Sequence, residues 1–392
     1  METAFALAFI MLFLFIGEWV SSFTKAYIPS VFISALLFLI GYWTIMPKNI
    51  TSTATFGTTF IDMAQGALLI HMGTLMSLKT LIKQWKAVSI ALLGVIGTVI
   101  LAMGGGLLLF DWRTVIASVP PLTGGIVAAF LMTNGLKAQH ILSLVSFPVS
   151  MFVIHSIIGY PLTAFLLKTE NKRLLRKFHL LKRKNKGKSI KSSQKEKESD
   201  TILHLPKIYQ TSALQIFLVI MLTALSMWLS SLTKGSVNPY IICLVVGVIA
   251  HRLHVLPNSV LQKAGVFNWF MYGLLAYIFS NLNRITPSNL VTILLPIITM
   301  IILGILGMFL ASIILAKPLG FSKSMAFASA LTALFGFPAD YIVTHESANN
   351  VGQNEEEREY LLYNTLPKML VGGFATVSVA SVIIASIFLK LL

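Results

Sequence analysis

One carboxylate stands where the sequence predicts an interrupted helix inside an apolar segment. In LTALFGFPADYIVTH, the residues Gly336, Phe337 and Pro338 are followed at once by Asp340. Glycine and proline interrupt helices, and a backbone group left unpaired in an apolar medium is costly. Because protein, water or a ligand must satisfy such groups, we expect Asp340 to coordinate a cation, take up a proton or pair with a substrate amine. The alternative is a carboxylate that only caps a helix.

A second interruption occurs earlier in the chain, in SVPPLTGGIVAAF. There Pro120 and Pro121 precede Thr123, Gly124 and Gly125. Two half-helices that meet tip to tip present N-terminal dipoles to an anion and free carbonyls to a cation. We therefore predict a re-entrant binding loop in each of the two segments. The alternative is that these glycines and prolines only kink packed helices.

Further polar residues complete the predicted solute- and ion-binding set. Several follow Asp340 and would line the pathway, although a loop in water has a similar composition. The whole set is Thr123, Gly124, Gly125, Asn134, Thr332, Gly336, Pro338, Asp340, Thr344, His345, Asn349 and Asn350. Asp340 is the predicted metal ligand, for Na+.

The composition predicts an all-α polytopic membrane protein in the inner or plasma membrane of the cell. Apolar residues make up 56% of the 392 positions and charged residues 11%, against about a quarter charged in soluble domains. A bilayer core about 30 Å thick needs about 20 apolar residues per helical span. Twelve apolar segments are present, near 3–21, 27–46, 58–77, 87–110, 114–134, 140–167, 212–231, 238–250, 264–281, 288–316, 323–344 and 366–392.

A basic linker separates two halves of the chain, residues 1–167 and 208–392. Of the 30 Lys and Arg residues, 14 lie in the linker, 168–207, so the net charge of +16 belongs largely to it. Its second part is polar and predicted to be disordered. Polybasic segments next to a membrane span lie in the cytoplasm and bind anionic lipid, which we expect here in preference to a regulatory role or RNA binding. No nucleic-acid partner is expected.

The two halves have the same order of segments, and the fifth segment of each is the least hydrophobic. If the fifth segments do not cross the membrane, each half has five spans. The lysines Lys79, Lys83 and Lys86 then share the cytoplasmic side with the linker, as the positive-inside rule favours, and both termini lie outside. Because five is odd, we predict two inverted repeats of five transmembrane helices, each with a re-entrant helical hairpin.

The motifs of common enzymes are missing from the chain. The sequence has no HExxH, no GxSxG, and no phosphate-binding glycine loop of the Walker type. The lone cysteine, Cys243, permits neither an intrachain disulfide nor a cysteine-based metal cluster. We therefore expect no enzyme activity and no cofactor beyond Na+ or H+ as coupling ion.

This plan resembles the glutamate–sodium symporter family and the related 2-hydroxycarboxylate carriers. The resemblance covers the two inverted halves, the central loop, and the segments PLTGGIVAAF, ALTALFGFPAD and LVGGFATVSVASVIIASIF. It implies a transport domain that carries both re-entrant loops, a scaffold domain that forms a homodimer, and elevator-like movement. By resemblance, the first loop contains Thr123, Gly124 and Gly125, and the second contains Thr332, Gly336, Pro338 and Asp340.

The chain also departs from that family's pattern. Its second loop has no glycine pair, and no Arg lies between Met325 and Asn350 to hold a substrate carboxylate. An acidic tip fits a cation or an amine at least as well as it fits glutamate. The leading hypothesis is cation-coupled symport or antiport of a small organic anion or amino acid. Sodium–proton exchange is the alternative within transport, and an intramembrane enzyme or a membrane sensor is the alternative from another class.

Overall fold

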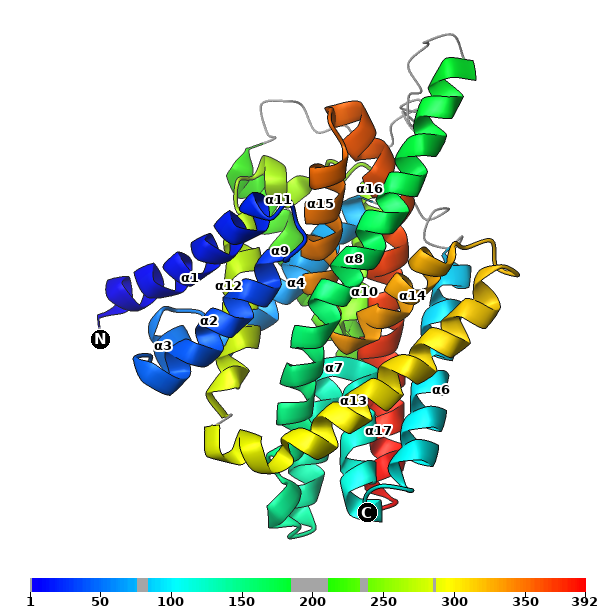
Figure 1. Cartoon of the computed structure of the whole chain (residues 1–392). Coiled ribbons are helices and arrows are strands. Elements are labelled where there is room, and N and C mark those ends of the chain that lie inside the picture. The colour runs from blue at the N-terminus through cyan, green and yellow to red at the C-terminus, as the bar shows by residue number, and fades with distance from the viewer. Residues whose placement is uncertain (1, 76–83, 185–210, 233–238, 285–286) are drawn as a thin grey trace. The chain divides into compact units, whose positions relative to one another are not determined.

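The computed structural model describes residues 2–75, 84–184, 211–232, 239–284 and 287–392 (Figure 1). All regular secondary structure in these ranges is helical, which confirms the all-α prediction. Five helices are long and apolar enough to cross a bilayer: α1 (Thr3–Phe23), α6 (Trp85–Gly106), α8 (Phe147–Lys184), α9 (Ser212–Leu232) and, from Ile293 to its end, α13 (Pro287–Ala316). The chain is a multi-pass membrane protein. Lys79, Lys83 and linker residues 185–207 lie outside the described ranges.

The helices form two compact units. Unit 1 comprises residues 1–11, 49–83 and 193–278, and unit 2 comprises residues 12–48, 84–192 and 279–392. Each unit therefore draws its helices from both sides of the linker.

Unit 1 is built around a close crossing of two short helices. Its elements are α3 (Ile50–Thr53), α4 (Thr58–Thr74), α9, α10 (Pro239–Arg252), α11 (Val260–Lys263) and most of α12 (Phe267–Ser280). At Gly73 of α4, a Cβ would lie 2.5 Å from the carbonyl oxygen of Leu244 on α10, so only glycine permits this approach. The neighbouring His71 is buried, and its Nδ1 accepts a hydrogen bond from the backbone N–H of Leu261 at 3.2 Å.

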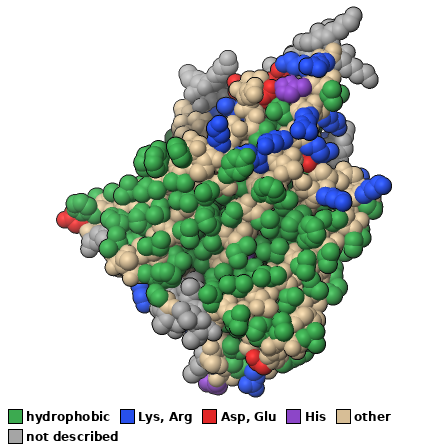
Figure 2. Space-filling view, in the orientation of Figure 1, with side chains coloured by type: hydrophobic (Ala, Val, Ile, Leu, Met, Phe, Trp, Pro, Cys, Tyr) green, Lys and Arg blue, Asp and Glu red, His purple; other side chains and the backbone are tan. Residues whose placement is uncertain are grey.

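Unit 2 contains the two segments that the sequence singled out. Its elements are most of α1, α2 (Ser30–Thr44), α6, α7 (Trp112–Ala138), α8, α13, α14 (Lys323–Leu331), α15 (Ala339–Val351), α16 (Glu355–Phe374) and α17 (Ser381–Leu389). Helices α6 and α13 pack through small residues, and the Thr98 hydroxyl donates to the Gly304 carbonyl at 3.0 Å. Hydrophobic side chains cover the outer face of these helices (Figure 2).

Helices α16 and α17 form one continuous rod. A π-helical segment, η5 (Ala375–Ala380), joins them without a turn. The buried Thr376 hydroxyl donates to the carbonyl oxygens of Gly372, at 3.0 Å, and Gly373, at 3.2 Å. Such π segments widen a helix locally and are frequent at functional sites. The rod supports both interrupted segments.

Candidate functional site

Helix α7 is broken in the middle by its glycine pair. Gly124 has φ −161° and ψ 24°, and Gly125 has φ 65° and ψ −149°, whereas the residues on both sides are helical. The positive φ of Gly125 lies in a region that residues with a Cβ avoid. The chain therefore changes direction between the two halves of α7.

The two ends of α7 lie beside the same end of the rod. The Trp112 Nε1–H donates to the Leu391 carbonyl at 2.8 Å, and the Gln139 side-chain amide donates to the Leu389 carbonyl at 3.1 Å. A straight helix of its 27 residues would separate these ends by about 40 Å. Because they meet the same turn instead, α7 is a helical hairpin that folds back at Gly124 and Gly125; we call it the first hairpin.

Helices α14 and α15 form a second hairpin of the same kind. The chain turns between them through the 3₁₀ segment η4 (Thr332–Leu334) and Gly336, which has φ 61°. At its start, the Ser322 hydroxyl donates to Glu170 Oε2 at 2.6 Å. Near its end, the Ser347 hydroxyl oxygen accepts from the Asn171 side-chain amide at 2.9 Å. Since Glu170 and Asn171 are neighbours on α8, the two ends of this hairpin lie together.

The tips of the two hairpins meet at Val377 in η5. A Cβ on Gly125 would lie 3.4 Å from Val377 Cγ1, and one on Gly336 would lie 2.9 Å from Val377 Cγ2. Both breaks therefore contact a single side chain of the π segment. The two interruptions, which are more than 200 residues apart in the sequence, form one site.

The two hairpins lie along opposite ends of the rod. In the first hairpin, Gly124 at the tip contacts Ser381, and Gly135 near its end contacts Leu389. The first hairpin thus runs along α17 toward the C-terminal end of the rod.

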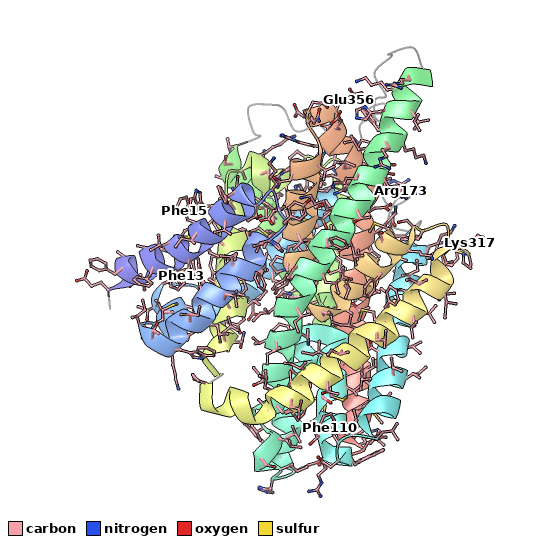
Figure 3. All side chains as sticks on the ribbon, in the orientation of Figure 1. Phe13, Phe15, Phe110, Arg173, Lys317 and Glu356 are labelled. Carbon is pink, nitrogen blue, oxygen red and sulfur yellow. The ribbon has the colours of Figure 1, made fainter. Side chains whose placement is uncertain are left out.

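The second hairpin runs along α16 in the opposite direction. Its tip carries Asp340 beside Gly373, and Ala348 near its end packs with Leu361. Figure 3 shows the same polarity within unit 2, where Phe110, just before α7, lies at the end opposite to Arg173 on α8. The tips therefore converge from opposite directions.

Asp340 is fully buried at the tip of the second hairpin. Its Oδ1 accepts from the backbone N–H of Tyr341 at 2.7 Å, and its backbone carbonyl accepts from the Thr344 hydroxyl at 2.6 Å. Its Oδ2 is buried without a hydrogen-bond partner among the described residues, and a Cβ on Gly373 would lie 2.6 Å from it. A buried carboxylate oxygen without a partner is costly, so this atom is a candidate ligand-binding atom.

Helix α8 holds the tip of the second hairpin. The Leu334 carbonyl, at the break, accepts from the Ser156 hydroxyl at 3.2 Å and is 2.5 Å from His155 Nε2. His155, Ser156 and Val377 were not among the predicted site residues. Val377 lies in LVGGFATVSVASVIIASIF, one of the segments that carry the family resemblance, whereas nothing in the sequence pointed to the two α8 residues.

The structure brings part of the predicted set together. The breaks at Thr123 to Gly125 and at Thr332 to Asp340 share the Val377 region, and Thr344 lies one turn further along α15. The ring of the half-buried His345 lies 4.2 Å from that of Tyr341 and is tilted from it by 34°. The predicted residues Asn134, Asn349 and Asn350 do not join the site, because their exposed side chains lie at the ends of the hairpins, remote from the tips.

A cation at this site would rely on Asp340 and on neutral oxygen atoms. Within the described ranges, no group of three or more His, Cys, Asp or Glu side chains is placed to hold a metal ion. Hydroxyl and carbonyl oxygens at the tips are the remaining ligands, and Na+ accepts such hard oxygen donors.

No model of a known protein family matches the chain, and no curated protein matches it significantly.

Proposed function

We propose that this chain is a secondary active transporter that couples Na+ or H+ to symport or antiport of a small organic anion or amino acid such as glutamate. The observation that carries the proposal is the meeting of two hairpin tips at Val377, beside the unpaired Oδ2 of the buried Asp340. Broken helices at the depth of a membrane are tolerated where they line a binding site, and transporters place ion and substrate sites there.

The finer fold in this proposal is a pair of inverted five-span repeats with re-entrant hairpins. The order of elements supports it, because α1, α2, α4, α6, the first hairpin and α8 recur as α9, α10, α12, α13, the second hairpin and the α16–α17 rod. The hairpins' opposite directions along the rod are those that inversion requires. Both hairpins belong to unit 2, which suits an elevator-like movement in which one body carries the site.

For topology, we propose that the linker is cytoplasmic, that the termini lie outside, and that the protein is a homodimer in the cell membrane. Helix α8 continues as far as Lys184, so its last turns carry the first part of the linker. Exposed bases there include Lys172, Arg176 and Lys177, and Figure 2 shows basic side chains gathered at this end of α8. Anionic lipid is the partner that such a surface suits.

A sodium–proton exchanger is the second candidate. It is favoured by the fact that Asp340 Oδ2 has no hydrogen-bond partner among the described residues, so this atom can bind either a proton or Na+. This function needs the carboxylate but needs no solute.

Flux in proteoliposomes tests both functions. The full chain should accumulate an organic solute under a Na+ or H+ gradient, and Asp340→Asn should keep the fold but lose the dependence on the gradient. Sodium flux driven by pH without any organic solute would favour the exchanger. Neither flux, from protein correctly inserted in the liposomes, would overturn the proposal.

A further inference from the structure

Helix α15 carries a row of buried polar residues on one side. Asp340, Thr344 and Ser347 are spaced by four and three residues, which places them on one face of the helix. Asp340 and Thr344 are completely buried, and Ser347 is almost so. The row runs from the tip of the second hairpin toward the end that lies beside Asn171.

Helix α8 carries a matching row. Ser156, Thr163 and Asn171 are buried and are spaced by seven and eight residues, about two turns each, so they share one side of the helix. Ser156 donates to the Leu334 carbonyl at the break, and Asn171 donates to Ser347. This side of α8 therefore faces the second hairpin at both ends. The two rows form a polar interface between α8 and α15, which we call the polar seam.

Three oxygen atoms of the polar seam are buried without a hydrogen-bond partner among the described residues: Asp340 Oδ2, Thr163 Oγ1 and Asn171 Oδ1. Both helices run from the tip toward the Asn171–Ser347 bond. Counted back from that bond, Thr163 lies eight residues away on α8 and Asp340 seven on α15, which is about 12 Å and about 10 Å along the two helices. Thr163 and Asp340 therefore lie at nearly the same level of the seam.

The polar seam offers negative charge and lone pairs. Asp340 at one end and Glu346, directly before Ser347, at the other have no ion-pair partner among the described residues. The hydroxyls of Thr344 and Ser156 donate to backbone carbonyls, so only their lone pairs remain for a ligand. Groups of this kind attract cations and disfavour anions.

The polar seam is closed in this structure. Leu167 is completely buried one turn from both Thr163 and Asn171 on α8, and the Asn171–Ser347 bond joins the two helices near the start of the linker. A cation can pass only where α8 and α15 separate locally. Hydroxyl and amide groups make such an opening less costly than an apolar interface would, because they bind water when the helices part.

We propose that the polar seam is the route by which the coupling cation reaches Asp340 from the linker end of α8, with Asn171 and Ser347 as its gate and Thr163 as a further oxygen ligand. This inference rests on the proposed function and adds to it the path of the cation within unit 2.

Cysteine labelling of the purified full chain tests the route, with Cys243→Ala as the background. Ser347→Cys and Thr163→Cys place a thiol in the seam with little change in volume, and the equally buried Ser118→Cys of the first hairpin is the matched control. The probe is the water-soluble cation methanethiosulfonate ethyltrimethylammonium, and its attachment is measured by the mass of the intact protein. Both seam variants should be modified about tenfold faster than Ser118→Cys, because local openings differ widely in free energy within one protein.

Asn171→Ala tests the gate. It removes the bond to Ser347 and should speed the modification of Thr163→Cys by about fivefold, the effect of one hydrogen bond on an opening equilibrium. The modification rate of Ser118→Cys should not change in the Asn171→Ala background. An equal rise for both cysteine variants would indicate a general loosening of the fold and would overturn the gate.

Flux in proteoliposomes links the seam to the cation. Modification of Ser347→Cys should stop gradient-driven flux, whereas the same treatment of Ser118→Cys should leave it unchanged. Seam variants that react as slowly as Ser118→Cys with and without Asn171→Ala, or that keep full flux after complete modification, would overturn the route. Absence of flux from the unmodified protein would instead reject the proposed function, because labelling reports the opening of the seam whether or not transport occurs.

Discussion

Gly373 of α16 is packed directly against the carboxylate of Asp340. A Cβ at this glycine would lie 2.6 Å from Asp340 Oδ2 and 3.5 Å from the Cα of Gly336. Carbon and oxygen atoms that are not bonded do not approach to 2.6 Å, so any larger residue must displace the carboxylate. The glycine therefore determines where the unpaired oxygen stands.

Replacing Gly373 with alanine should impair transport strongly while the protein still folds. Overpacking a buried position costs about 1–3 kcal/mol, and here the displaced group is the proposed binding carboxylate. We expect the affinity for the coupling ion or solute to fall by about tenfold or more. Gly104→Ala is the matched control, because a Cβ at Gly104 would meet nothing within 4 Å. Wild-type affinity in Gly373→Ala would show that Oδ2 takes no part in binding.

The positions of the two helix breaks could be predicted from the sequence, because a break inside an apolar segment has a local cause. Gly124 and Gly125, and Gly336 beside Pro338, permit backbone angles outside the helical range, and the breaks lie at these predicted residues. The predicted interruption at Pro120 and Pro121 was wrong, because both prolines lie within the regular first half of α7. That the two helix breaks lie close together was predicted only from the internal repeat of the sequence.

The contacts that hold the hairpins could not be predicted in the same way. They depend on side chains far away in the sequence, such as Glu170 and Asn171, which look like ordinary polar residues at the start of a basic linker. Similarly, Asn349 and Asn350 follow Asp340 closely in the sequence, but the length of α15 carries them to its exposed end. Distance along a helix, rather than composition, separates them from the tips.

The bond between Asn171 and Ser347 should stabilise the closed ends of the second hairpin. Both side chains are buried, and the bond is 2.9 Å long. Asn171→Ala and Ser347→Ala should each lower the free energy of unfolding by about 1 kcal/mol or more, because each leaves a buried polar partner unpaired. The double variant should cost less than the sum of the two, measured by thermal unfolding. The exposed Asn350→Ala is the control, and additive costs for the pair would contradict the contact.

The first hairpin should lose stability in acid through Asp111, its N-cap. Its carboxylate accepts from the Thr114 hydroxyl at 2.6 Å and from the Thr114 N–H at 3.1 Å. The hydroxyl hydrogen bond lowers the pKa of Asp111 below its ordinary value. A carboxyl whose folded pKa is lowered stabilises the fold above its unfolded pKa, and this contribution is lost as the pH falls through the folded value. Asp111→Asn keeps a capping side chain but should flatten this part of the Tm profile below about pH 4. Parallel profiles for the two proteins would refute the assignment.

Deleting residues 186–200 of the linker should leave transport unchanged. This polar, strongly charged tract cannot bury a core of its own. The deletion also leaves intact the contacts of α8 with the hairpins, which end before it. The measurement is solute flux per inserted molecule in proteoliposomes, with the full chain as reference. Complete loss of flux at normal insertion would assign the linker a direct role.

Replacing Gly124 or Gly125 of the first hairpin with alanine should lower stability and flux for two different reasons. Gly125 has φ 65° and ψ −149°, a combination that almost only glycine adopts, and its Cβ would make only an ordinary contact of 3.4 Å with Val377. Gly125→Ala should therefore cost about 1–3 kcal/mol through backbone strain. Gly124 has an extended φ of −161°, but a Cβ there would collide with the side chain of Ser381.

A second substitution separates the two causes. Ser381→Gly removes the side-chain atoms that Gly124→Ala strikes, so the double variant should recover part of the lost Tm and flux relative to Gly124→Ala alone. The same Ser381→Gly should bring no recovery to Gly125→Ala, because that strain lies in the backbone of residue 125 itself. Ser381→Gly alone supplies the baseline, since glycine in a helix costs about 1 kcal/mol. Equal recovery of both alanine variants, or of neither, would contradict the contact between the hairpin tip and the rod.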